Sequence, residues 1–128
     1  MIGFTIGDCM STKRIVPDIT TEQMEESRGF YQGVLGLELA MDMGWVMTFV
    51  SPTNASAQIT VLQTSASEGP RPQMTIEVDD VDAVHEKAVA LGCEIVYPIT
   101  DESWGVRRFF LRDPNGVVLN VMSHESTD

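Results

Sequence analysis

An internal duplication constrains the fold of this chain more than any other feature. Leu91-Gly92-Cys93-Glu94 resembles Leu35-Gly36-Leu37-Glu38, 56 positions earlier, and Asp113-Pro114-Asn115-Gly116 resembles Ser51-Pro52-Thr53-Asn54, 62 positions earlier. Because the two pairs keep their order and nearly keep their spacing, the sequence predicts one supersecondary unit used twice. The growth of the offset places a longer loop in the second copy, between residues 97 and 105.

Each copy reads as a strand, a helix and three further strands. In the first, we expect a strand at residues 13–20, and a capping box at Thr20-Thr21-Glu22-Gln23 that opens a helix ending at Gly36. In the second, Asp80 is the expected N-cap of a helix that Gly92 ends. The remaining strands are expected at residues 38–41, 45–50, 55–62, 73–78, 93–97, 106–112 and 117–122.

This organisation predicts an α+β fold in which tandem βαβββ modules form a curved mixed sheet with the helices on its outer face. The modules span residues 13–64 and 73–124 and together make a single domain. Residues 1–12 are expected to be a disordered or loosely attached extension, because translation can start at Met10 instead of Met1.

Charge and cysteine content narrow the partners and the compartment. The formal net charge of -11 argues against nucleic acid and anionic membranes, which repel such a surface. No run approaches the roughly 20 apolar residues that a membrane helix needs. Cys9 and Cys93 have no metal-binding or redox spacing, so we expect free thiols in a cytoplasmic protein.

Strand alternation predicts where a binding site lies. One face of each strand is apolar and should pack on the helices, whereas the other face is mixed. With tight hairpin turns, the mixed face gains aromatic, methionine, amide and charged side chains. These are Trp45, Met47, Phe49, Gln58, Gln73, Trp104, Arg107, Phe109 and Asn120, with Asp18 and Glu77 as weak candidates for a general base. Such a composition is typical of a small-molecule cleft and also of a dimer interface, and we favour the cleft.

Two of these side chains have competing interpretations. Trp104 is either a stacking platform at the rim or a loop anchor that packs on the body, and we favour the anchor. Arg107 either binds an anionic ligand or forms a salt bridge with Glu77 or Asp18.

Several motifs resemble those of a known superfamily. Phe30-Tyr31-Gln32-Gly33-Val34-Leu35-Gly36-Leu37, Val78-Asp79-Asp80-Val81-Asp82-Ala83 and the segment from Trp104 to Gly116 resemble the "FY…vLGL", "V-D-D-V-D-A" and "WG-x-R-x-F…RDPxG" signatures of the vicinal oxygen chelate superfamily. This is the glyoxalase, bleomycin-resistance and dioxygenase group. The resemblance covers nearly the whole chain, but it does not select one activity.

Metal-using members of that superfamily place His, Gln or Glu ligands on the first and last strands of each module. By the motif register those positions are Val16, Gln58, Gln73 and Asn120, and an insertion in the first helix moves the first to about Ser11. Neutral amides without an imidazole or carboxylate are poor ligands. The resemblance therefore implies the metal-free branch, and we expect no metal and no cofactor.

The expected function is that of an antibiotic-resistance-like binding protein. It would be a cytoplasmic homodimer that sequesters aromatic small molecules, cationic ones included, in a metal-independent cleft within one chain or between two. We expect binding rather than catalysis. The alternatives are a lyase, an isomerase or a dioxygenase-like enzyme with a relocated metal or a carboxylate base, and an interaction module whose mixed face is the dimer surface.

Overall fold

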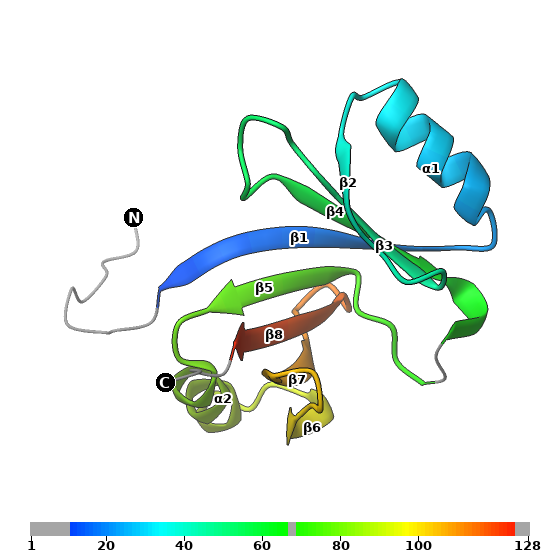
Figure 1. Ribbon diagram of the computed structural model, residues 1–128. Coiled ribbons are helices and arrows are strands. Elements are labelled where there is room, and N and C mark those ends of the chain that lie inside the picture. Colours follow the sequence, from blue (N-terminus) through cyan, green and yellow to red (C-terminus); the bar gives the residue numbers. More distant parts are fainter. Residues whose placement is uncertain (1–10, 67–68, 125–128) are drawn as a thin grey trace.

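A computed structural model describes residues 11–66 and 69–124 of the 128-residue chain. Two modules of the same plan follow one another (Figure 1). The first contains β1 (Thr12–Thr21), α1 (Met24–Gly33), β2 (Glu38–Asp42), β3 (Val46–Val50) and β4 (Gln58–Gln63), followed by a 3-10 turn at Thr64–Ala66. The second contains β5 (Met74–Val78), α2 (Val81–Ala90), β6 (Ile95–Asp101), β7 (Val106–Arg112) and β8 (Val118–His124). The predicted βαβββ order is confirmed.

All eight strands form one mixed sheet with the order β2-β3-β4-β1-β5-β8-β7-β6. The modules join where β1 pairs antiparallel with β5, which lie side by side in Figure 1. Within each module the first strand pairs parallel with the last, as β1 does with β4 and β5 with β8. The sheet is curved and open, and both helices cover the same face. We call that face the outer face and the opposite one the inner face.

Two apolar clusters hold the helices on the outer face. Under α2, Val81 and Ala88 pack with Phe109 and Val121, with partly buried Cys93 at the margin. Under α1, Met24 and Tyr31 pack on a second cluster of strand residues: Met47, Phe49 and Val61, each with 0% exposure. The predicted packing of the apolar strand faces on the helices is confirmed for β4, β5 and β8. It is wrong for β1, where Ile15 and Ile19 are 52% and 36% exposed and Val16, on the opposite face, is buried. Cys9 lies outside the described residues.

The start of α1 differs from the prediction. Thr20 and Thr21 belong to β1, and the helix N-cap is Gln23, whose side chain makes no capping hydrogen bond. Thr21 Oγ1 instead accepts a hydrogen bond from the Gln23 backbone N–H at 2.8 Å. The predicted capping box is wrong because β1 runs on to pair with β4 as far as Thr21. The Asp80 cap of α2 is confirmed, since Asp80 Oδ1 accepts from Ala83 N–H at 3.0 Å.

No helix in the described part of the chain has both the length and the apolar character to cross a bilayer.

Candidate functional site

The register of the two hairpins decides which side chains reach the inner face. Gln58 lies opposite Val50, and Asn120 lies opposite Phe110. The pairing of β3 with β4 is displaced by three residues, and that of β7 with β8 by one residue, from the pairings that tight turns predict. At the β7–β8 turn the reason is visible: Asp113 Oδ1 accepts the Val117 N–H at 2.9 Å, so Val117 joins the turn. A shift by an odd number of residues sends every side chain of a strand to the other face.

Four predicted ligand-binding residues therefore do not share a face with Gln58 and Asn120. Met47 and Phe49 are buried under α1, and Phe109 is buried under α2, where the His85 ring meets it edge-on at 4.8 Å. Trp45 lies just before β3, two residues from Met47 and therefore on the same face of the sheet, and is 45% exposed. Their predicted place on the inner face is wrong, and they are core or outer-face residues.

Arg107 also lies on the outer side. Its Nη2 contacts Asp82 Oδ1 of α2 at 2.9 Å, and its Nη1 contacts Asp101 Oδ1 at 3.0 Å. The predicted salt bridge to Glu77 or Asp18 is therefore wrong. The neighbouring Arg108 takes the inner face instead, because successive residues of a strand point to opposite sides.

The inner face carries a pocket at the junction of the two modules. It has a volume of about 130 Å³ and is lined by Asp18 of β1, Leu62 of β4, Thr75 of β5, Arg108 of β7 and Asn120 of β8, with Pro72 before β5. Residues from five strands thus converge on one small space. Two of the predicted site residues, Asp18 and Asn120, meet here.

A hydrogen-bond chain organises the polar wall of this pocket. Asn120 Nδ2 donates to Thr75 Oγ1 at 3.1 Å, and Thr75 Oγ1 donates to Asp18 Oδ2 at 2.6 Å. Asn120 is 8% exposed, and its Oδ1 is buried without a hydrogen-bond partner among the described residues.

Asp18 is the electrostatic centre of the pocket. Burial raises the pKa of Asp18 to about 6, because removal from water disfavours the carboxylate, although the Thr75 hydrogen bond and the charge of Arg108 act in the opposite direction. Its Oδ1 has no hydrogen-bond partner within the described segments. Asp18 can therefore exchange a proton or accept a donor from a bound molecule near neutral pH.

Arg108 forms the opposite wall. Its Nε donates to Glu102 Oε2 at 2.6 Å, and Glu102 Oε2 also accepts from the Tyr97 hydroxyl at 3.0 Å. The guanidinium carbon lies 5.2 Å from the Trp104 ring centre and 4.9 Å from that of Phe110. Trp104 is 63% exposed, and its ring packs on the guanidinium of Arg108.

A second polar cluster lies further along the inner face. Arg14 Nε contacts Glu77 Oε1 at 2.5 Å, and Arg14 Nη1 donates to Gln58 Oε1 at 2.6 Å. His124 Nδ1 lies 2.9 Å from Glu77 Oε2. Burial would raise the pKa of Glu77, but the hydrogen bonds from His124 and Arg14 outweigh it, and the pKa lies below its usual value. Glu77 is thus a poor general base.

The residues at the superfamily's metal positions do not fit a divalent cation. Val16 is apolar and 4% exposed, Gln58 is held by Arg14, and the Asn120 amide is turned to Thr75. Gln73 is exposed just before β5. A guanidinium beside Gln58 and Glu77 opposes a metal ion there. Among residues 11–66 and 69–124, no three His, Cys, Asp or Glu side chains are grouped as metal donors.

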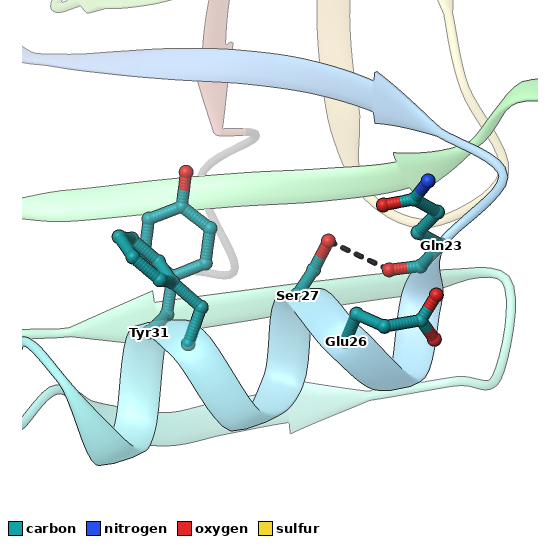
Figure 2. A pocket seen from close by; sticks show the side chains of 5 residues that line it. Gln23, Glu26, Ser27 and Tyr31 are labelled. Carbon is teal, nitrogen blue, oxygen red and sulfur yellow. Dashed lines mark hydrogen bonds between the residues drawn. The ribbon is translucent and has the colours of Figure 1, made fainter.

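A larger hollow of about 330 Å³ lies on the surface of α1 (Figure 2). Gln23, Glu26, Ser27, Phe30 and Tyr31 line it. The Ser27 hydroxyl donates to the Gln23 carbonyl at 2.8 Å, inside the same helix. All five residues come from one stretch of chain and no second element converges on them, so the smaller inner pocket is the better candidate site.

The fold and the pocket define a class: a tandem βαβββ protein with a polar pocket on the sheet face away from its helices. The family model of the Glyoxalase/Bleomycin resistance protein/Dioxygenase superfamily matches residues 11–121, and the chain belongs to this superfamily. No curated protein sequence matches the chain significantly.

Solved structures of the same fold come from proteins with different activities. A superfamily member from Vibrio splendidus is 15% identical, with a TM-score of 0.67 over 88% of this chain and 99% of that one. A methylmalonyl-CoA epimerase from Mycobacterium tuberculosis is 17% identical, with a TM-score of 0.67 over 96% and 94%. An extradiol ring-cleaving dioxygenase from B. fuscum is 16% identical, with a TM-score of 0.70 over 98% of this chain and 36% of that one. At these identities the likeness shows the fold alone.

Sequence reasoning missed the residues that complete the pocket. Thr75 of β5 and Leu62 of β4 alternate with the apolar residues of their strands and so belong to the mixed face. Arg108 precedes a Phe-Phe pair in β7. The available signal was the doublet Arg107-Arg108, since in any strand one of the two must face inward. Without the hairpin register, the sequence could not say which.

Proposed function

We propose that this protein binds a small organic molecule in the inner pocket without a metal ion, in the manner of the bleomycin-resistance type. The ligand is aromatic and carries a cationic group that binds Asp18. One observation carries the proposal: a largely buried carboxylate with an unpartnered oxygen, in a pocket that five strands build.

The charges around the pocket favour a cation at this point. Arg108 is paired with Glu102, whose side chain is only 12% exposed, so the guanidinium is already neutralised on one edge. Asp18 has no such partner and receives one neutral hydrogen bond, from Thr75. An ammonium that donates to Asp18 Oδ1 would replace the lost hydration of the carboxylate. Leu62 and Pro72 offer apolar contact for the rest of the ligand, and the exposed Trp104 ring offers a stacking surface.

Benzylamine, benzyl alcohol and benzoate are suitable first probes, with binding measured by calorimetry and thermal shift in the presence of EDTA. Benzylamine is expected to bind and to raise the melting temperature, and the two others are expected to bind more weakly. Asp18→Asn should weaken benzylamine at least tenfold. Asp82→Asn, which alters a carboxylate paired with Arg107 outside the pocket, is the matched control and should leave binding unchanged. Equal binding of all three probes, or binding that requires a divalent metal, would contradict the proposal.

A second candidate function is an enzyme of the lyase or isomerase kind with Asp18 as general base. The specific observation is a carboxyl group whose pKa is about 6, within reach of a pocket that also contains a guanidinium. Such a pair suits removal of a proton next to a carbonyl, with Arg108 stabilising the developing oxyanion. The test is hydrogen–deuterium exchange at the α-carbon of small keto and thioester compounds, followed by NMR. Exchange that survives Asp18→Asn would eliminate Asp18 as the base.

A further inference from the structure

Arg108 keeps hydrogen-bonding capacity that its visible partners do not use. Its Nε is bound to Glu102, but neither Nη group donates to another residue in the described part of the chain. Three aromatic rings fix the guanidinium, with their centres 5.4 Å (Tyr97), 5.2 Å (Trp104) and 4.9 Å (Phe110) from its central carbon. A guanidinium held in this way presents its remaining N–H groups at a fixed place.

The same pocket contains an unused acceptor. Asp18 Oδ1 has no partner among the described residues, and both Asp18 and Arg108 line the pocket. The charge of Arg108 also acts on Asp18 directly, since it lowers the pKa that burial raises. The pocket thus offers one free acceptor and one free donor group across a space of about 130 Å³.

We propose that the pocket selects amino-carbonyl ligands, in which an ammonium and a carbonyl or carboxylate group are attached to the same or to adjacent carbon atoms. The ammonium binds Asp18 Oδ1, and the oxygen accepts from the Nη groups of Arg108. This inference rests on the proposed binding function and adds a second recognition point to it. A ligand with only one of the two groups leaves either Asp18 Oδ1 or the Nη groups of Arg108 without a partner in a partly buried site, which is costly.

The test compares three probes that share a phenyl ring. Phenylglycine carries both groups on one carbon, benzylamine carries only the ammonium, and phenylacetate carries only the carboxylate. Titrations are followed by Trp104 fluorescence in a Trp45→Phe background, because Trp104 stacks on Arg108 and Trp45 lies outside the pocket. Phenylglycine is expected to bind at least tenfold more tightly than either of the other two.

The Arg108→Lys variant tests whether the guanidinium N–H groups are needed or only the positive charge. Lysine keeps a positive group near Glu102 but loses the fork of N–H groups. Phenylglycine should weaken about tenfold in this variant, whereas benzylamine should change less than twofold. Arg107→Lys is the matched control, because the adjacent arginine lies on the other face with Asp82 and Asp101. It should change neither affinity.

The outcomes distinguish the two levels of the proposal. If phenylglycine binds no more tightly than benzylamine to the unmodified chain, the amino-carbonyl inference is overturned and the binding of a cation by Asp18 stands. Equal weakening of both probes by Arg108→Lys also overturns it, because Arg108 would then act only on the shape of the pocket. If none of the three probes binds, both the proposed function and this inference fail. The comparison of the three probes is also made by calorimetry on the unmodified chain, and that measurement needs no variant to fold.

Discussion

Asp18 sets the pH dependence that is expected at the scale of single residues. Its ordinary pKa is 3.8, and burial raises the pKa to about 6 in the folded protein. The folded state therefore holds this proton more tightly than the unfolded state does. The stabilisation is complete below about pH 4 and is lost as the pH rises towards 6. Above pH 6 the buried carboxylate costs the fold about 3 kcal/mol, at 1.36 kcal/mol for each unit of pKa.

Asp18→Asn removes that cost. The variant is expected to be about 3 kcal/mol more stable than the unmodified chain at pH 8 and nearly equal to it at pH 4. Urea unfolding at both pH values measures the difference. A gain that is the same at pH 4 and pH 8 would show that Asp18 does not titrate with the raised pKa. The same substitution weakens the binding of benzylamine, so this site would trade stability for binding.

Thr75 connects the two predicted site residues that do meet. Thr75→Val removes the hydroxyl that accepts from Asn120 and donates to Asp18, and leaves the Asn120 amide without a partner. The expected loss in unfolding free energy is about 1–3 kcal/mol. The pKa of Asp18 should rise further, because the hydrogen bond that lowers it is gone. NMR titration of the Asp18 carboxyl carbon measures the second effect. Thr60→Val, which removes a hydroxyl without a described partner on the paired strand β4, should change neither quantity.

At the scale of elements, the sequence predicts the strands and helices better than the way they face. Strand alternation correctly separates the apolar and mixed sides of β4, β5 and β8, because it depends only on neighbouring residues. The hairpin register depends instead on how a turn closes. Asp113 adds Val117 to its turn through a side-chain hydrogen bond. As a result, Phe110 and Arg108 lie on the inner face in place of Phe109 and Arg107. Composition alone does not reveal such a bond.

The two helices provide an internal comparison of capping. Asp80 caps α2 through Ala83, whereas Gln23 at the same place on α1 makes no side-chain cap. Asp80→Ala is therefore expected to lower the unfolding free energy by about 1 kcal/mol. Gln23→Ala should change it by no more than about 0.5 kcal/mol, in line with surface substitutions. Urea unfolding of the two variants at one pH makes the comparison, and equal losses would show that the Asp80 hydrogen bond contributes nothing.

At the scale of the whole molecule, the two modules differ in how well their helices are buried. Helix α2 buries Val81 and Ala88, but α1 buries no residue. Phe30, Val34 and Leu35, at and just after the end of α1, are 49%, 68% and 53% exposed. The duplicated plan could be predicted from sequence, but this asymmetry could not, because both helices carry apolar residues. Such an apolar surface is typical of an interface, and it supports the expected homodimer.

We predict that the first module forms that homodimer, with the exposed end of α1 in the interface. Light scattering coupled to gel filtration should give a mass of about twice 14.1 kDa. Each chain carries a net charge of -11, so the two copies repel one another and added salt should tighten the dimer by screening. Val34→Glu places a further charge in the contact and should raise the dissociation constant at least tenfold. Leu91→Glu, at a 75% exposed position after α2, is the control and should leave the mass unchanged. A dimer that breaks with Leu91→Glu and survives Val34→Glu would assign the interface to the second module instead.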